Sequence, residues 1–99
     1  MAQVDNSNAM IWDATDFKVT LPSQLSIDQL AALIKQNGWL NLPVKKVDFS
    51  QVSKADSAIF AVLLIWASRV EEKLQVINLP EDLQTLIKLY DLDEVLALV

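Results

Sequence analysis

The sequence predicts a single α/β domain, a mixed sheet of about four or five strands with three or four helices packed on it. Residues 44–49, 56–73 and 74–79 have the patterns of a strand, a very apolar helix and a second strand, with no hairpin turn between the strands. That order implies a right-handed parallel crossover. Residues 9–14 and 17–21 are instead separated by a short polar turn and predict an antiparallel hairpin, which makes the sheet mixed.

Length and composition fit one domain with one core. The chain has 99 residues, of which 53% are hydrophobic, and it contains three Trp and one Gly. Such a composition supports a compact core and argues against a low-complexity chain. The first residues are polar, and no linker or internal repeat follows them. We therefore expect a disordered tail over residues 1–8 and one domain over residues 9–99.

Composition also excludes several functions. The formal net charge is −5, and the eight basic residues are spread along the chain, so nucleic-acid binding is not expected. The absence of His and Cys removes the usual general base and thiolate metal ligands. A single Gly cannot form a glycine-rich phosphate loop. We expect no catalytic residue, no cofactor, no metal site and no enzyme activity.

The N-terminal sequence MAQVDNSNAM lacks the basic start and apolar run of a signal peptide. The unbroken apolar run at residues 58–67 is ten residues long, whereas a helix needs roughly 20 to cross a bilayer. The sequence thus predicts a cytoplasmic protein with no segment inserted in a membrane.

Two further helices have recognisable ends. Residues 26–37 predict a helix that begins at a capping box formed by Ser26 and Gln29 and closes at Gly38. A later helix should begin after Pro80. Its buried stripe follows helical spacing and comprises Leu83, Leu86, Ile87 and Tyr90.

The last segment, residues 92–99, is compatible with a short helix or with an edge strand. Its content of good helix formers favours the helix.

The very apolar helix at residues 56–73 has two apolar sides on a helical wheel. The side expected to face the sheet comprises Ile59, Val62, Leu63, Trp66 and Val70. The outer side comprises Ser57, Phe60, Ala61 and Leu64. An outward apolar patch beside a polar helix start suggests a protein-binding surface. The alternative is that another segment of the chain covers this patch.

Asp56 and Ser57 stand at the start of that helix, where backbone N–H groups are unpaired and carry partial positive charge. A hydroxyl in this place suits a phosphoryl group or a polar contact with another protein. Asp and Ser are also preferred helix caps, and the pattern alone favours a cap with no further role. Ser53 and Lys54, just before them, would frame any contact.

Residues 46–69, KVDFSQVSKADSAIFAVLLIWASR, resemble the core of a STAS domain, the fold of the bacterial anti-sigma-factor antagonists. The family pattern is a strand ending in Asp-x-Ser, then Asp-Ser or Asp-Thr at the start of an apolar helix. Here the strand ends in DFS at 48–50, and the helix begins with Asp56 and Ser57. The chain departs from the pattern at Ile59, where many members have Gly.

The stretches LPSQLSIDQL and LPEDLQTLIKLYDLDEVL are similar to the small STAS subunit of the Mla phospholipid ABC transporter. This resemblance implies a non-catalytic subunit that binds the cytoplasmic ATPase subunit (MlaF-like), and through it a membrane permease. Its effect would be to stabilise or activate the ATPase, while the chain itself stays peripheral at the inner membrane.

The wider family implies an alternative, a soluble partner-switching regulator controlled by phosphorylation of Ser57. Both functions would use one surface, and we expect its contact residues to be Ser53, Lys54, Asp56, Ser57, Phe60, Ala61 and Leu64. Exposed apolar residues favour the permanent subunit, because its partner always covers them.

Overall fold

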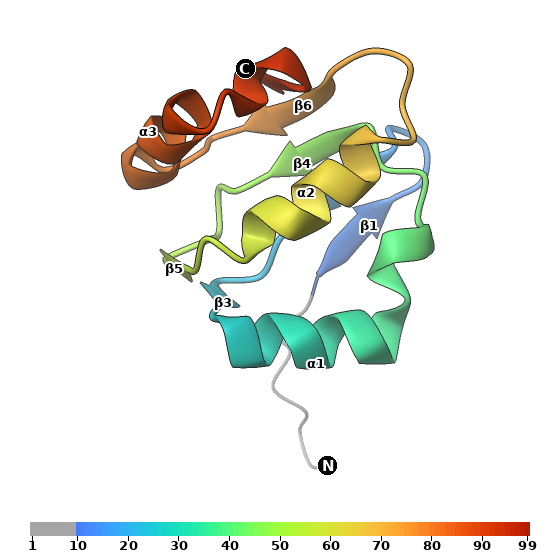
Figure 1. Cartoon of the computed structure of the whole chain (residues 1–99). Helices are drawn as coiled ribbons and strands as arrows, with labels where there is room; N and C mark the ends of the chain where they lie inside the picture. Colours follow the sequence, from blue (N-terminus) through green and yellow to red (C-terminus); the bar gives the residue numbers. More distant parts are fainter. Residues whose placement is uncertain (1–9) are drawn as a thin grey trace, which may run out of the picture.

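A five-stranded mixed sheet forms the centre of the protein, with three α-helices packed on it in residues 10–99 (Figure 1). The computed structural model describes these residues, apart from the side chains of Leu33, Gln36, Asn37 and Trp39. The expected tail over residues 1–8 lies outside the described residues. In sheet order the strands are β1 (Ile11–Asp13), β2 (Lys18–Thr20), β4 (Lys46–Asp48), β6 (Leu74–Ile77) and β7 (Leu96–Leu98).

The pairing of the strands agrees with the predicted fold class. β1 runs antiparallel to β2 as the predicted hairpin, and the remaining neighbours are parallel. Val19, Val47 and Val76 lie side by side in register and are fully buried. Lys46 and Asp48, on either side of Val47, are only half-buried. Since successive side chains point to opposite faces of a strand, one face carries the core and the other carries Lys46 and Asp48.

The first helix, α1 (Ile27–Asn37), ends as predicted and begins differently. Gly38 has a φ of 60°, and its N–H bonds to the Ile34 carbonyl, the left-handed helix end that Gly favours. The predicted capping box is wrong, because the Ser26 hydroxyl donates to the Gln29 side-chain oxygen at 3.0 Å. The Ile27 N–H donates instead to the Asp56 carboxylate at 3.2 Å. A distant loop therefore caps α1, and η1 (Trp39–Asn41) follows it.

A second, two-stranded sheet is a feature that the sequence did not predict. β3 (Gln24–Leu25) and β5 (Lys54–Ala55) pair in parallel. The N–H groups of residues 53 and 54 donate to the Ser23 carbonyl at 2.9 and 3.1 Å. The Asp56 N–H donates to the Leu25 carbonyl at 3.1 Å. This pairing joins the segment just before α1 to the segment that leads into the second helix.

The second helix, α2 (Ile59–Ala67), is shorter than the predicted 56–73. At its start the chain is held in the pairing of β5 with β3. At its end the Ser68 hydroxyl donates to the Ile65 carbonyl at 2.7 Å, and the Arg69 guanidinium donates to the Leu40 carbonyl. The N–H groups of Arg69 and Val70 donate to the carbonyls three residues back, those of Trp66 and Ala67, and the chain leaves the helix towards β6.

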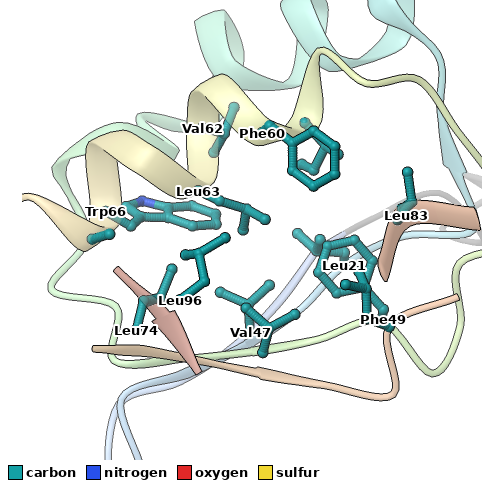
Figure 2. Packing of buried hydrophobic residues seen from close by; sticks show 14 of the residues in the cluster. Leu21, Val47, Phe49, Phe60, Val62, Leu63, Trp66, Leu74, Leu83 and Leu96 are labelled. Carbon is teal, nitrogen blue, oxygen red and sulfur yellow. The ribbon is translucent and has the colours of Figure 1, made fainter. Parts of the chain in front are cut away.

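The side of α2 predicted to face the sheet is confirmed. Ile59, Leu63 and Trp66 are fully buried. Figure 2 shows Trp66 and Leu63 extending from α2 towards Val47 and Leu74 of the strands. Val62 is 3% exposed, and Val70 packs partly buried against the core.

The third helix, α3 (Glu81–Leu89), begins after Pro80 as predicted. Leu83 and Ile87 are buried, and Leu86 is partly buried against the core. The predicted stripe is wrong at Tyr90, which is 58% exposed. Tyr90 lies just past the last helical residue, so helical spacing no longer sets its direction.

The favoured interpretation of residues 92–99 as a helix is also wrong. A single 3₁₀ turn, η2 (Leu92–Glu94), leads into the edge strand β7, which pairs in parallel with β6. Leu96 becomes 1% exposed in this strand. Helix propensity differences are small, up to about 0.7 kcal/mol per ordinary residue, whereas full burial of a Leu side chain gains about 1.5–3 kcal/mol.

Replacing Leu63 by Ala should lower the free energy of unfolding by about 2–5 kcal/mol, because it leaves a cavity under α2. Urea unfolding measures the change. The matched control is Leu64→Ala on the same helix, where 39% of the side chain is exposed, and a much smaller loss is expected. Equal losses in both variants would mean that α2 is rotated from the orientation described.

Asp48 should make the fold more stable at neutral pH than in acid. Burial raises the pKa of Asp48, but the backbone N–H of Ser50 and the amide of Asn78 donate to its carboxylate and leave the pKa below its ordinary value. A lowered pKa in the folded state stabilises the protein above the unfolded-state pKa of about 3.9. This stability is lost as pH falls through the folded-state value.

The Asp48→Asn variant should therefore be less stable than the wild type at pH 7. The difference should shrink as pH falls below about 4. Chemical unfolding of both proteins across this range measures it, and parallel pH profiles would contradict the assignment.

Candidate partner-binding site

The predicted site residues meet where β5 leads into α2. Ser53, Lys54, Asp56 and Ser57 are all exposed there. The Ser57 carbonyl accepts the N–H of Phe60 at 3.0 Å, whereas its hydroxyl forms no hydrogen bond with any residue that the structure describes. The hydroxyl of Ser57 is thus available to another molecule.

Asp56 does not cap its own helix. The residue before α2 is Ala58, and α2 has no side-chain cap, so the interpretation of Asp56 and Ser57 as a cap of α2 is wrong. The carboxylate of Asp56 bonds to the N–H of Ile27 in α1, and its carbonyl accepts the N–H of Ile59 in α2. Asp56 therefore links the first turns of the two helices.

Ser53 takes part in internal bonds of the small sheet. Its hydroxyl donates to the Ser23 carbonyl at 3.2 Å and accepts from the Gln24 amide at 3.1 Å. Its neighbour Lys54 is exposed beside a shallow pocket that Asp82 also lines. Ser53 thus holds the edge of the site, and Lys54 presents a positive charge there.

The outward direction expected for Phe60 is wrong, because this side chain is only 6% exposed. Figure 2 shows Phe60 on the core side of α2, with Leu21, Phe49 and Leu83 around the space that it enters. Leu83 belongs to α3, so side chains from two strand ends and from α3 share this space with Phe60. Phe60 belongs to the core.

Ala61 and Leu64 do lie on the outer side of α2, and two residues that the sequence analysis did not include join them. Leu64 is 39% exposed, Ile65 is 37% exposed, and Ile27 of α1 is 59% exposed. Ala61, Leu64 and Ile65 are three and four residues apart, so the helical spacing contained the signal for Ile65. We call Ile27, Ala61, Leu64 and Ile65 the outer patch.

An apolar groove of about 220 Å³ runs between α1 and α2 beside the outer patch. All the residues that line it are apolar: Ile27, Leu30, Ala31, Ile34, Leu40, Ala58, Ala61, Val62 and Ile65. Such a lining offers no side-chain hydrogen bonds to a polar ligand. It suits apolar side chains from another protein.

Other kinds of site are not found in the part of the chain that the structure describes. Within residues 10–99 no three His, Cys, Asp or Glu side chains come together in a way that would hold a metal ion. In the same residues no helix has the length and apolar character needed to cross a membrane.

A family model described as MlaB, STAS domain, matches residues 12–99. No curated protein and no solved structure matches the chain. The matched region contains the DFS strand end of β4, Asp56 and Ser57, and all the residues of the outer patch. The mixed sheet and its helices have the architecture expected of such a domain. On this match and this fold, the chain belongs to the STAS domain family, in the group that the MlaB model describes.

Proposed function

We propose that the protein is a non-catalytic subunit of an Mla-type ABC complex, which transports phospholipids and maintains the lipid asymmetry of the outer membrane. In this role it binds the cytoplasmic ATPase subunit and stabilises or activates it. The ATPase in turn connects the chain to the membrane permease, so that the protein is cytoplasmic and peripheral at the inner membrane. Membership of a family that is in general non-catalytic supports the absence of a reaction.

The observation that carries this proposal is the outer patch next to Ser57. Three large aliphatic side chains, Ile27, Leu64 and Ile65, are each more than a third exposed. Ile27 and Ile65 line a groove whose lining residues are all apolar, and Leu64 lies on the same side of α2 as Ala61 of that lining. A surface of this kind favours a lasting contact, because a permanent partner keeps it covered.

The contact residues follow from this geometry. Ser57, Ala61 and Leu64 would lie against the ATPase, with Ile65 and Ile27 completing the apolar part. Lys54 and Ser53 would frame the contact at the β5 side. Asp56 would act mainly by holding the starts of α1 and α2, and Phe60 would support the surface from below.

A partner-switching regulator controlled by Ser57 is the second candidate. The observation that favours it is the exposed Ser57 hydroxyl, which has no hydrogen bond within the described residues. Native affinity purification distinguishes the two functions. Recovery of an ATPase and a permease supports the transporter subunit, and recovery of a kinase-like anti-sigma factor supports the regulator.

A charge placed on the outer patch should release the ATPase. In Leu64→Asp, an unpaired carboxylate would have to be desolvated against an apolar partner, which costs about 1–3 kcal/mol or more. That is roughly a fivefold or greater loss of affinity. Ser57→Asp should also weaken binding, because the helix start offsets its charge by only about 0.3–1 kcal/mol. Co-purification measures binding, and circular dichroism verifies the fold.

The matched control is Leu89→Asp, which makes the same change at a 68% exposed Leu at the end of α3. It should retain the ATPase at the wild-type level. Retention of the ATPase by Leu64→Asp and Ser57→Asp alike would reject the proposed surface. Release by Ser57→Asp alone, with Leu64→Asp unaffected, would favour the phosphorylation switch.

Asp56 should contribute to the fold through α1. Asp56→Ala removes the acceptor of the Ile27 N–H and should cost about 1 kcal/mol of stability, as for loss of a helix cap. Asp56→Asn retains a side-chain oxygen and should lose less. Urea unfolding compares them, and an Asp56→Ala variant as stable as the wild type would show that the bond to α1 has no structural role.

A further inference from the structure

The apolar groove between α1 and α2 has opposite charges at its two ends. The two helices run in the same direction, so both of their starts lie at one end of the groove (Figure 1). At that end the Asp56 carboxylate accepts the N–H of Ile27, which lines the groove. At the other end the Arg69 guanidinium donates to the carbonyl of Leu40, which also lines the groove. A carboxylate therefore stands at one end and a guanidinium at the other.

Arg69 also lines a second, more polar pocket of about 350 Å³. The other charged residues that line this pocket are Lys45, Lys73, Glu71 and Glu72, so the cations exceed the acids by one charge. None of these five side chains forms an ion pair with a residue that the structure describes. A guanidinium carries five N–H donors, and in the described part of the chain it meets one acceptor, the carbonyl in the groove. Arg69 therefore has donors left for an anion.

The groove and the polar pocket together define the chemistry of a ligand. Arg69 connects them, because it lines the pocket and bonds to Leu40 of the groove. Along α2 the groove extends from Ala58 to Ile65, which is about 10 Å at 1.5 Å per residue. A ligand that fits both hollows is apolar over this length and anionic at one end. The carboxylate of Asp56 repels an anion at the opposite end, so the charged end belongs beside Arg69.

We propose that the groove binds a single-chain amphiphile with an anionic head, either a fatty acid or a monoacyl lipid phosphate. Its chain lies along the groove, and its head accepts hydrogen bonds from Arg69 and faces Lys45 and Lys73. This site goes beyond the proposed function, although the groove shares three residues with the outer patch. The test needs no ATPase, so either proposal can fail without the other.

The test titrates the complete isotope-labelled protein with decanoate and, separately, with decyl phosphate, each below its critical micelle concentration. Methyl NMR should show shifts at Ala31, Ile34, Leu40 and Val62 of the groove and none at Leu89 on α3. The head that binds more tightly, carboxylate or phosphate, indicates which class of lipid the site prefers. Octanoate, with two methylenes fewer, should bind about fifteenfold more weakly than decanoate.

Decyltrimethylammonium is the matched control ligand, because it has the same chain and a cationic head. The net charge of the protein is −5 and in general attracts a cation. Binding of this ligand at least about tenfold more weakly than decanoate would therefore report the charge at the end of the groove and not that of the whole protein.

Two pairs of measurements separate the head from the chain. Arg69→Gln should weaken decanoate about tenfold and leave uncharged decanol unchanged, which also verifies that the groove is intact. Ala31→Leu fills the groove and should abolish binding of both ligands. Its matched control is Ala32→Leu, an exposed neighbour on α1 that does not line the groove, and it should bind like the wild type.

Three results would overturn the proposal. One is the absence of shifts in the groove with both anionic ligands. Another is binding of decyltrimethylammonium as tight as that of decanoate. The last is concentration-dependent dimerisation of the free protein that shifts the same methyl signals, because the occupant would then be a second copy of the chain.

Discussion

Ile59, Leu63 and Trp66 of α2 are fully buried against the sheet, and the orientation of this helix depends on them. With this side fixed, the spacing of a helix places Ala61, Leu64 and Ile65 on the opposite side. All nine residues of α2 are apolar, so the helix has no polar side to present to solvent. The packing that stabilises the domain therefore also leaves an apolar surface exposed on the other side of the helix.

The small β3–β5 sheet makes this surface continuous between two helices. Its strands come before and after α1 in the chain. The Asp56 carboxylate accepts the Ile27 N–H at the start of α1, and the Asp56 carbonyl accepts the Ile59 N–H at the start of α2. The groove between the helices is lined from both of them. Asp56 and Ser57 thus differ in role. Asp56 holds the starts of α1 and α2 together, whereas Ser57 leaves its hydroxyl exposed at the rim of the outer patch.

The sequence predicted the elements whose pattern is long or strongly periodic. Helical spacing placed Leu63 and Trp66 in the core, and the order of apolar segments predicted the mixed sheet. Phe60 was misplaced because its side chain enters a space bordered by Leu21, Phe49 and Leu83, which are remote from it in sequence. The two-residue strand β5 is too short to show a period, and the pairing of β7 with β6 overrode the helix propensity of its residues. At the site, the same wheel placed Leu64 outward, whereas Ile27 lies on α1 and was not included in the predicted contact.

The central claim is that one side of α2 holds the fold while the other binds the ATPase. Methyl NMR of the isotope-labelled protein, recorded with and without the purified ATPase subunit, tests it directly. The account predicts that the methyl signals of Ile27, Leu64 and Ile65 shift or broaden most, and that those of Leu89, on the surface of α3, stay unchanged. Changes concentrated at Leu89, with Leu64 and Ile65 unaffected, would contradict it.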